Sequence, residues 1–525
     1  MDNFDTELLK GKKRLHFVGI GGSGMYPLVQ ILAAAGYTIT GSDVNEGHII
    51  EYERAMGIDV QIPHAASNVD GADLLVYTAA ILPGNPEIAR AKELGIPCVE
   101  RSVMLGYVQR LYAKSICVAG THGKTTTTGM ITQILEMAGK DPAAVIGGKL
   151  PLIGGYGKAG TGENIVVESC EFSNTFLHLA PDTSIILNID ADHLDFFKTM
   201  DNLKASFRKF AGLTQRRVIA NGDDENTIET LLGLDREVVT FGEGAHCDWR
   251  AANVRMLRPA FYGYEVWHGT EKLADVALAV PGRHNVLNSL AAFAAAFLAG
   301  CTAQQITAGL AAFSGTGRRF EILGHTASGA TVADDYAHHP TELQATLSAA
   351  KQMGFARVIA VFQPFTYSRT KLLLQDFARV LQIADHVVMS EIMGSRETND
   401  DYHIYTADLA ALIPGSVWFA DFDGIVDYIA KNAVAGDLVI TLGGGDIYNA
   451  AERMGAPNAC WAPSIMEQTT QGRAPRRPAL CTFYILCAFY IRYPPATMAR
   501  ADPPPHRPVP KTPAPVPGWQ DPPPG

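Results

Sequence analysis

Short apolar segments alternate with longer amphipathic segments along the first 455 residues. In the first part of the chain, apolar runs cover residues 15–18, 38–40 and 73–77, and helical patterns cover residues 26–35, 51–56 and 86–94. Strands that alternate with helices in this way are typical of βαβ units, whose strands lie parallel in one sheet. We therefore expect the chain to begin with an α/β domain.

The same alternation starts again twice. An apolar run at 115–119 opens a second segment, with further runs at 165–167 and 184–187 and an alanine-rich helix at 286–299. A third segment starts near residue 315, with runs at 331–333, 357–362, 386–389 and 438–441. Without an internal repeat of fixed period, this pattern predicts three distinct α/β domains at residues 1–113, 114–314 and 315–455, followed by an unrelated segment at 456–525.

Composition separates this last segment from the rest. The chain has 525 residues, 47% of them hydrophobic, which is enough for several buried cores. However, 13 of the 30 prolines lie in the last 32 residues, and residues 456–525 carry a net charge of +4, which leaves −15 on residues 1–455. We expect a disordered, proline-rich tail, which is a linker, a recognition peptide or an unselected extension.

Charge and cysteine usage limit the partners and the compartment. Nucleic acid and anionic membranes repel so acidic a body, so neither is an expected partner. The polar, acidic start of the chain lacks the order of a secretory signal, and the eight cysteines form no CxxC pair. The longest apolar run, residues 479–491, is shorter than the ~20 residues that span a bilayer. We expect a cytoplasmic protein.

Two glycine-rich loops each follow an expected strand and precede an expected helix. Residues 19–24 fit G-x-G-x-x-G, a pattern that lets a diphosphate approach the backbone at a helix N-terminus, and Asp43 stands where a ribose-binding carboxylate would. This loop alone is compatible with NAD(P), FAD, another diphosphate nucleotide or no ligand. Residues 120–125, GTHGKT, form a shortened phosphate loop, in which Lys124 would offset phosphate charge and Thr125 would ligate Mg²⁺. The second loop favours ATP over a dinucleotide cofactor.

Acidic and imidazole groups follow two strands of the second segment. Glu168 and Glu171 lie at the end of one strand, and the sequence 192–195, DHLD, follows the next. Ligands bind outside the carboxyl ends of parallel strands, so Glu168 and His193 are candidates for a Mg²⁺ site beside the phosphate loop. His193 alone would more often be an ordinary loop histidine.

The third segment adds candidate anion-binding residues. Arginines and histidines occur in the stretches 282–285, 317–320, 334–340 and 362–370. Arginine can bind phosphate or carboxylate through two parallel hydrogen bonds. Taken singly, each of these residues is more typical of a surface ion pair or a helix cap. Only the set as a whole indicates an anion-binding site.

The order of these motifs resembles the Mur ligase family of cytoplasmic, ATP-dependent, amide-forming enzymes over roughly residues 14–454. Within the family it is most similar to the branch that joins L-alanine to UDP-N-acetylmuramate in peptidoglycan synthesis. The resemblance implies a Rossmann-like N-terminal domain for the UDP-sugar, a central P-loop ATPase domain and a Rossmann-like C-terminal domain that closes over ATP and the amino acid. It also implies an acyl phosphate, formed from ATP and the lactyl carboxylate and then attacked by the amine.

The resemblance further implies residue roles, with ATP and Mg²⁺ as cofactors. The residues that would bind the UDP-substrate are Gly19, Gly21, Gly22, Gly24, Ser42 and Asp43. Those that would bind ATP are Gly120, Thr121, His122, Gly123, Lys124, Thr125, Thr126, Asn285, Arg319 and Asp335. The metal ligands would be Thr125, Glu168 and His193, and the amino acid would be bound by Tyr336, His338 and Arg369. The catalytic residues would be Lys124, Glu168, His193, Arg319 and His338.

Some positions depart from the family pattern, and some alternatives stay open. Many relatives carry a His-Arg pair where this chain has Phe365 and Thr366, and branches that act later carry a carbamylated lysine near the position of Phe207. The branch that recycles murein tripeptides onto the same sugar nucleotide is the nearest alternative. A dinucleotide-dependent oxidoreductase and an idle nucleotide-binding protein are more distant ones. The sequence fixes neither the oligomeric state nor the selectivity among Ala, Ser and Gly.

Overall fold

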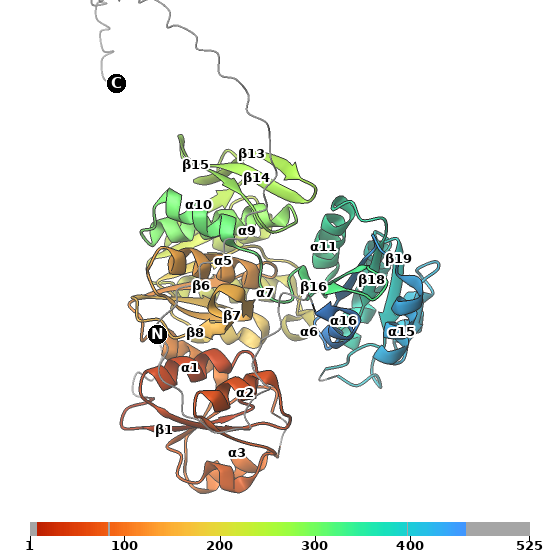
Figure 1. Ribbon diagram of the computed structural model, residues 1–525. Coiled ribbons are helices and arrows are strands. Elements are labelled where there is room, and N and C mark those ends of the chain that lie inside the picture. The colour runs from red at the N-terminus through yellow and green to blue at the C-terminus, as the bar shows by residue number, and fades with distance from the viewer. Residues whose placement is uncertain (1–7, 82–83, 396, 458–525) are drawn as a thin grey trace, which may run out of the picture. The chain divides into compact units, whose positions relative to one another are not determined.

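The computed structural model describes residues 8–81, 84–395 and 397–457. Within them, three separate sheets follow one another along the chain, each with its own helices (Figure 1). The expected three-domain α/β fold is confirmed. The domain boundaries stay predictions, and the expected tail beyond residue 457 lies outside the described residues.

The first sheet has five strands in the order β3-β2-β1-β4-β5, all parallel. Its strands are β1 (Arg14–Val18), β2 (Thr38–Ser42), β3 (Asp59–Gln61), β4 (Leu74–Tyr77) and β5 (Cys98–Glu100). Its helices are α1 (Tyr26–Ala34), α2 (His48–Ala55), α3 (Pro86–Glu93) and α4 (Arg101–Gln109), with a 3₁₀ turn at Ala66–Val69. The strand order reverses beside β1, so the loop after β1 lies where open parallel sheets bind ligands.

The central sheet has ten strands, in the order β15-β14-β13-β12-β11-β10-β6-β9-β7-β8. They are β6 (Lys114–Ala119), β7 (Ala143–Leu150), β8 (Gly155–Lys158), β9 (Asn164–Glu168), β10 (Thr183–Ile186), β11 (Arg217–Asn221), β12 (Glu237–Gly242), β13 (Trp249–Arg258), β14 (Phe261–His268) and β15 (Glu271–Ala277). Strands β13 to β15 pair antiparallel, an extension that the alternation of strands and helices did not predict.

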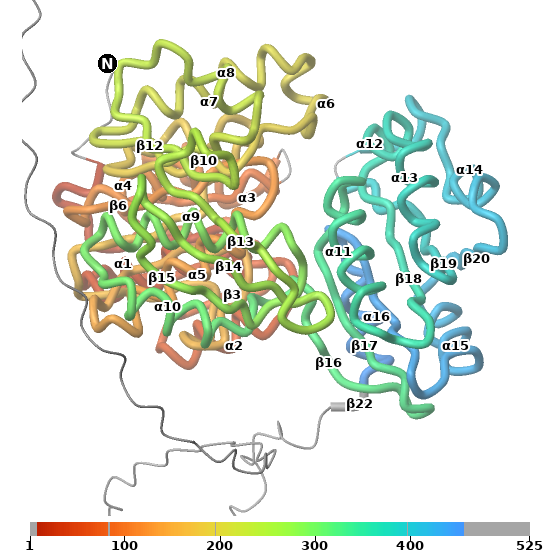
Figure 2. The backbone as a smooth tube through the Cα atoms, turned by 90° about the horizontal axis from the view of Figure 1, so that it is seen from above, coloured from red at the N-terminus to blue at the C-terminus, as the bar shows by residue number. Residues whose placement is uncertain are grey.

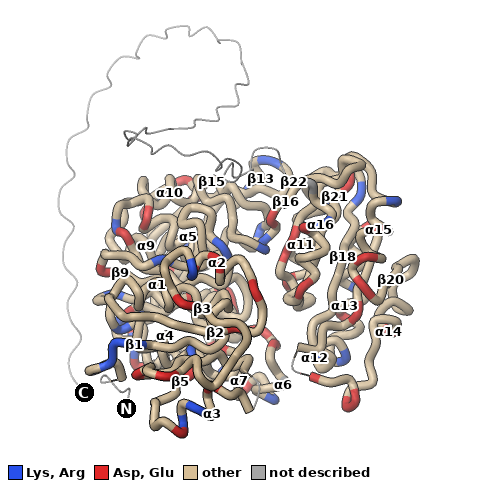
Figure 3. The backbone as a smooth tube through the Cα atoms, turned by 60° about the horizontal axis from the view of Figure 1, so that its bottom comes forward, with Lys and Arg blue, Asp and Glu red and all other residues tan. Residues whose placement is uncertain are grey.

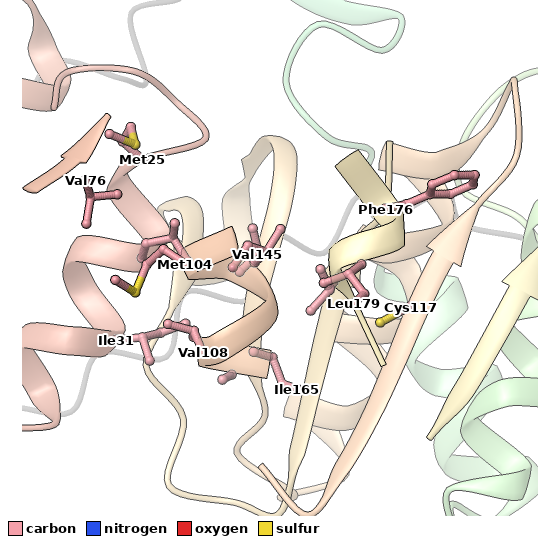
Figure 4. Packing of buried hydrophobic residues seen from close by; sticks show 14 of the residues in the cluster. Met25, Ile31, Val76, Met104, Val108, Cys117, Val145, Ile165, Phe176 and Leu179 are labelled. Atoms are coloured by element: carbon pink, nitrogen blue, oxygen red, sulfur yellow. The ribbon is translucent and has the colours of Figure 1, made fainter. Parts of the chain in front are cut away.

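Three helices cover one face of this sheet and also pack against one another. They are α5 (Lys124–Met137), α9 (His284–Leu298) and α10 (Ala303–Ala312). The remaining helices of this part are α6 (Leu194–Phe197), α7 (Met200–Leu213) and α8 (Glu225–Leu231), with 3₁₀ segments at Pro151–Ile153 and Phe172–His178. A continuous apolar cluster joins the first two sheets; Figure 4 shows Met104 and Val108 of α4 in the same cluster as Val145 and Ile165.

The third sheet has seven strands in the order β20-β19-β18-β21-β17-β16-β22. They are β16 (Glu321–His325), β17 (Thr331–Asp335), β18 (Val358–Phe362), β19 (His386–Ser390), β20 (Val417–Phe419), β21 (Leu438–Leu442) and β22 (Ala456–Pro457). Strand β22 pairs with β16, so the first two residues assigned to the tail belong to this sheet.

Helices cover both faces of the third sheet (Figure 2). On one face lie α11 (Pro340–Gln352) and α13 (Leu374–Leu381), and on the other α15 (Phe422–Asn432) and α16 (Tyr448–Met454). Two shorter helices are α12 (Tyr367–Leu372) and α14 (Thr406–Ala410). Acidic and basic residues are interspersed over all three domains (Figure 3). Among the described residues, no helix is long and apolar enough to cross a membrane.

Candidate active site

The phosphate loop joins β6 to α5. Its glycines take left-handed conformations, with φ of 136° at Gly120 and 85° at Gly123. A Cβ added at Gly123 would lie 2.4 Å from the Oδ1 atom of Asn288 in α9, so a larger residue cannot fit there. The glycines therefore let the loop turn tightly against α9.

Lys124 is the first residue of α5, and its ammonium group is fixed in place. Its Nζ donates to the carbonyl oxygens of Gly120 and Thr121 and lies 2.9 Å from Oε2 of the buried Glu171. Burial acts to lower the pKa of Lys124, but the charge of Glu171 and the hydrogen bond to it outweigh burial and raise that pKa. A permanent positive charge thus sits at the positive end of a helix dipole, an arrangement that favours bound phosphate.

Thr125 and Glu168 form a direct pair of oxygen donors. The Thr125 hydroxyl donates to Oε1 of Glu168 over 2.8 Å, and the backbone N–H of Gly147 donates to Oε2 over 2.6 Å. A Cβ at Gly147 would lie 2.6 Å from the carboxylate, so glycine is required at this position. Hydroxyl and carboxylate oxygens are ligands that Mg²⁺ accepts, so these residues fit the expected metal.

His193 reaches the same region from the loop between β10 and α6, directly before the first residue of α6. Its φ is 55°, its ring packs on Phe172 with centroids 4.8 Å apart, and its Nε2 lies 3.7 Å from the buried Asp192. Asp192 also accepts a 2.7 Å hydrogen bond from Arg369. Burial favours a higher pKa for Asp192, but the charges of His193 and Arg369 hold that pKa well below its usual range. An ionised carboxylate therefore connects a predicted metal ligand with a predicted amino-acid-binding residue.

Residues of the third domain contact the phosphate-loop residues directly. Arg319 donates to the Thr125 hydroxyl over 3.2 Å, and its guanidinium lies 4.9 Å from the centre of the Tyr336 ring. Asp335 accepts from the backbone N–H groups of Phe320 and Ala337, and so holds the segments on either side of Arg319 and Tyr336 together. Burial raises the pKa of Asp335 to about 6, with Arg319 acting in the opposite direction.

His338 and Arg369 differ in which of their side-chain nitrogen atoms have hydrogen-bond partners. The Nδ1 atom of His338 lies 3.0 Å from the Tyr336 carbonyl oxygen, and burial lowers the pKa of His338 to about 4, so the ring is neutral near pH 7. The Nη1 atom of Arg369 is buried and has no hydrogen-bond partner among the described residues. The Phe365 ring lies 5.9 Å from the His338 ring and 6.0 Å from the Arg369 guanidinium.

His122 links the phosphate loop to two acids that the sequence did not single out. Its Nε2 lies 3.0 Å from Asp190, and its Nδ1 lies 3.2 Å from Glu342 of α11. Burial opposes protonation, but both carboxylates raise the pKa of His122 to about 9. Asp190 lies two residues before Asp192, and Glu342 follows the His-His-Pro stretch, yet neither spacing alone indicates contact with the loop.

One cavity of about 1400 Å³ gathers most of the predicted residues. Its lining includes Thr121, His122, Gly123, Lys124, Thr125, Thr126, Glu168, His193, Asn285, Arg319, Asp335, Tyr336, His338 and Arg369. Gly120 is outside the lining. Asn285 donates to the Pro281 carbonyl oxygen and accepts from Asn288, which sets its side chain at the start of α9.

The first glycine loop lies mostly outside that cavity. Of its residues, Ser23 lines the cavity, together with His48 and Arg101 of the same domain. Asp43 accepts a 3.0 Å hydrogen bond from the N–H of Gly21, which fixes the loop. The Ser42 hydroxyl is buried and donates to Glu87, so its contact with a sugar nucleotide stays a prediction.

Arg101 is a candidate that the sequence analysis missed. It begins α4, and a Cβ built on Gly24 would lie 3.5 Å from its guanidinium, so the cation lies directly beside the first glycine loop. The available signal was an arginine at the start of the helix after β5. A single residue without a surrounding motif did not stand out.

The fold and this site define the class of the protein. Family models match residues 14–112 (Mur ligase family, catalytic domain), 118–296 (Mur ligase middle domain) and 318–445 (Mur ligase, glutamate ligase domain). The chain belongs to the Mur ligase family.

Two relatives of high sequence identity carry the name of one particular enzyme of this family. The chain is 44% identical over 447 residues to UDP-N-acetylmuramate–L-alanine ligase of Caldanaerobacter subterraneus subsp. tengcongensis, covering 84% of this chain and 97% of the relative. It is 43% identical over 445 residues to the enzyme of that name from Agathobacter rectalis, covering 83% and 96%.

Solved structures of two kinds are similar to the chain. The UDP-N-acetylmuramate-alanine ligase of Thermotoga maritima is 29% identical, with a TM-score of 0.71 over 84% of this chain and 98% of its own. A murein peptide ligase from Psychrobacter arcticus is 26% identical, with a TM-score of 0.67 over the same shares.

Proposed function

We propose that this chain joins L-alanine to the lactyl carboxylate of UDP-N-acetylmuramate, with conversion of ATP to ADP and phosphate. One observation carries the proposal: a single cavity brings the phosphate loop together with Arg319, His338 and Arg369 of the third domain. The curated relatives at 43–44% identity, which carry the name of this activity, support the choice of substrates.

Charge neutralisation is the main task at the ATP end. A carboxylate is a poor electrophile, so its oxygen first attacks the γ-phosphorus of ATP, and ADP leaves. Lys124 and Arg319 neutralise charge on the transferred phosphoryl group, and loop N–H groups position it. Thr125, Glu168 and His193 would hold Mg²⁺, which when bound supplies further charge neutralisation on the phosphates.

The amino-acid end requires orientation and exclusion of water. We assign the carboxylate of L-alanine to Arg369, whose buried Nη1 atom has no hydrogen-bond partner among the described residues, while Asp192 accepts from its Nη2 atom. The amine attacks the acyl carbon, the amide C–N bond forms, and phosphate leaves with the former carboxylate oxygen and takes up the proton that the amine loses. His338, with its low pKa, is too weak a base to take the amine proton, so we assign it a positioning role.

Phosphate release from purified protein tests this proposal. With ATP, Mg²⁺ and UDP-N-acetylmuramate present, we expect L-alanine to give a higher kcat/KM than L-serine, glycine or murein tripeptide. Highest turnover with the tripeptide would assign the chain to the recycling branch. Phosphate release that does not depend on the sugar nucleotide would contradict the proposal altogether.

A further inference from the structure

Away from the proposed ATP and amino-acid residues, a cysteine, a histidine and an aspartate converge between two loops of the central sheet. Asp223 lies two residues after the end of β11, and His246 and Cys247 lie in the loop between β12 and β13. One donor atom from each lies within 4.8 Å of the other two. The Oδ1 atom of Asp223 is 3.7 Å from the Cys247 sulfur and 3.6 Å from Nε2 of His246.

These separations match the edges of a tetrahedral metal site. With Zn–S near 2.3 Å and Zn–N or Zn–O near 2.0 Å, tetrahedral angles place neighbouring donor atoms roughly 3.3 to 3.5 Å apart. The two distances from Asp223 exceed this range by only a few tenths of an ångström, and the Cys247 and His246 donor atoms lie within 4.8 Å of each other. Closing these three edges to tetrahedral length would let the donors share one cation.

Glycines surround the cluster, and their lack of a side chain leaves space for the three donor groups. A Cβ at Gly222 would lie 2.6 Å from the Cys247 sulfur, and one at Gly242 would lie 2.5 Å from Asp223. A Cβ at Gly244 would lie 2.3 Å from the His246 ring. Gly222 after β11, Gly242 at the end of β12 and Gly244 after it thus leave room for the three donor groups.

The present contacts leave the cluster able to bind a cation. Asp223 accepts from the N–H groups of Glu243 and Gly244, and a carboxylate has further lone pairs for a metal. The Nε2 atom of His246 lies 3.0 Å from the Gly222 carbonyl oxygen, a bond that the exposed ring can exchange for a metal bond.

A nucleophilic triad is the main alternative for these residue types, and the geometry disfavours it. The Cys247 sulfur contacts the carboxylate rather than the imidazole.

We propose that Asp223, His246 and Cys247 form a site for a divalent cation of the zinc class, with water in the fourth position. A sulfur, a nitrogen and an oxygen donor suit Zn²⁺ or Co²⁺ and do not suit Mg²⁺. The cation joins the loop after β11 to the loop after β12. The flanking residues Asn221, Asp224 and Phe241 line the large cavity, so the site adjoins the proposed nucleotide pocket without sharing its ligands.

Co²⁺ titration of the full-length, reduced protein in excess Mg²⁺ tests the site. Wild type should bind one Co²⁺ with a thiolate-to-cobalt charge-transfer band, and Zn²⁺ should displace it. Cys247→Ser should abolish the band. His246→Ala, an exposed change that leaves folding intact, should weaken Zn²⁺ binding by at least about 10-fold, since even outer-shell partners contribute roughly 10 to 100-fold.

Cys170→Ser is the matched control, because Cys170 lines the large cavity and is the competing thiol there. This variant should keep the band and the stoichiometry. A band lost in Cys170→Ser and kept in Cys247→Ser would place the cation in the cavity and overturn the proposal. Absence of the band in folded wild type, or unchanged Zn²⁺ affinity in His246→Ala, would also overturn it.

Discussion

The two glycine-rich loops look alike in sequence and differ in the side chains that surround them. Both follow a buried parallel strand and lead into a helix, and Gly19 and Gly120 both have positive φ values. The helix after the second loop, α5, begins with Lys124, whereas the helix after the first loop, α1, begins with the buried Tyr26. The cation beside the first loop is Arg101, from another helix.

We infer from this difference that one backbone motif serves two nucleotides. Both loops are rich in glycine, but only the second is surrounded by a lysine, a hydroxyl and a carboxylate together. We infer that the first loop binds a diphosphate without reacting with it and that the second carries out phosphoryl transfer. Substitutions in the second loop should therefore affect kcat, and those beside the first should affect KM.

The largest effect is expected at Lys124. Lys124→Met should lower kcat about 100 to 1,000-fold, because a fixed charge on the transferred phosphoryl group is lost. It also leaves Glu171 buried without its cation, so the melting temperature should fall. Steady-state phosphate release and thermal melts measure the two effects.

Two further variants separate charge from folding at this position. Glu171→Gln added to Lys124→Met should restore the melting temperature and leave kcat low. Lys114→Met removes an exposed pair with Glu163 and should change neither quantity appreciably. If the double variant recovered its rate, the catalytic role of Lys124 would be wrong.

A smaller effect is expected at the oxygen pair of the second loop. Glu168→Gln should lower kcat about 10 to 100-fold and raise the Mg²⁺ concentration that gives half-maximal rate, because a charged oxygen donor becomes neutral. Titration of Mg²⁺ at saturating ATP measures this shift. An unchanged Mg²⁺ dependence would remove Glu168 from the metal site.

The first loop should respond through binding instead. Arg101→Ala should raise KM for UDP-N-acetylmuramate about 10-fold, because hydrogen bonds to charged groups contribute ~1.5–3 kcal/mol. The kcat value and the KM for ATP should change little. A loss confined to kcat would contradict the division of labour between the loops.

The smallest effect concerns a buried acid that, unlike Glu171, has no cation beside it in the part of the chain that the structure describes. Glu53 of α2 is fully buried, and neither carboxylate oxygen has a hydrogen-bond partner among the described residues. Burial, with a contribution from Asp43, raises the pKa of Glu53 to about 8. The folded protein therefore holds the Glu53 carboxyl group in its protonated form. The free energy of unfolding of the wild type should fall as the pH rises from about 4.5, the pKa of this group in the unfolded chain, through about 8, its pKa in the folded protein.

Glu53→Gln removes this titration. Its melting temperature should vary less than that of wild type between pH 5 and 8, and should exceed it by about 1–3 °C at pH 8. Differential scanning calorimetry at both pH values measures the difference. Parallel pH profiles for the two proteins would show that Glu53 does not titrate in this range.

Local patterns predicted the parts of the molecule that depend on short stretches of chain. Both glycine loops, the strands that carry them and the acids at the ends of β9 and β10 could be read from the sequence, because each lies beside its own motif. The antiparallel β13 to β15 could not, because these three strands follow one another without an intervening helix and so lack the βαβ alternation. Contacts between distant residues were also missed, such as His122 with Glu342 and Gly24 with Arg101.

The most direct test of the account follows oxygen atoms through the reaction. UDP-N-acetylmuramate labelled with ¹⁸O at both carboxylate oxygens is incubated with the protein, ATP, Mg²⁺ and L-alanine, and the released phosphate is analysed by mass spectrometry. Attack of the carboxylate on the γ-phosphorus predicts one ¹⁸O atom in every phosphate released. Unlabelled phosphate, formed while the amide product accumulates, would contradict it.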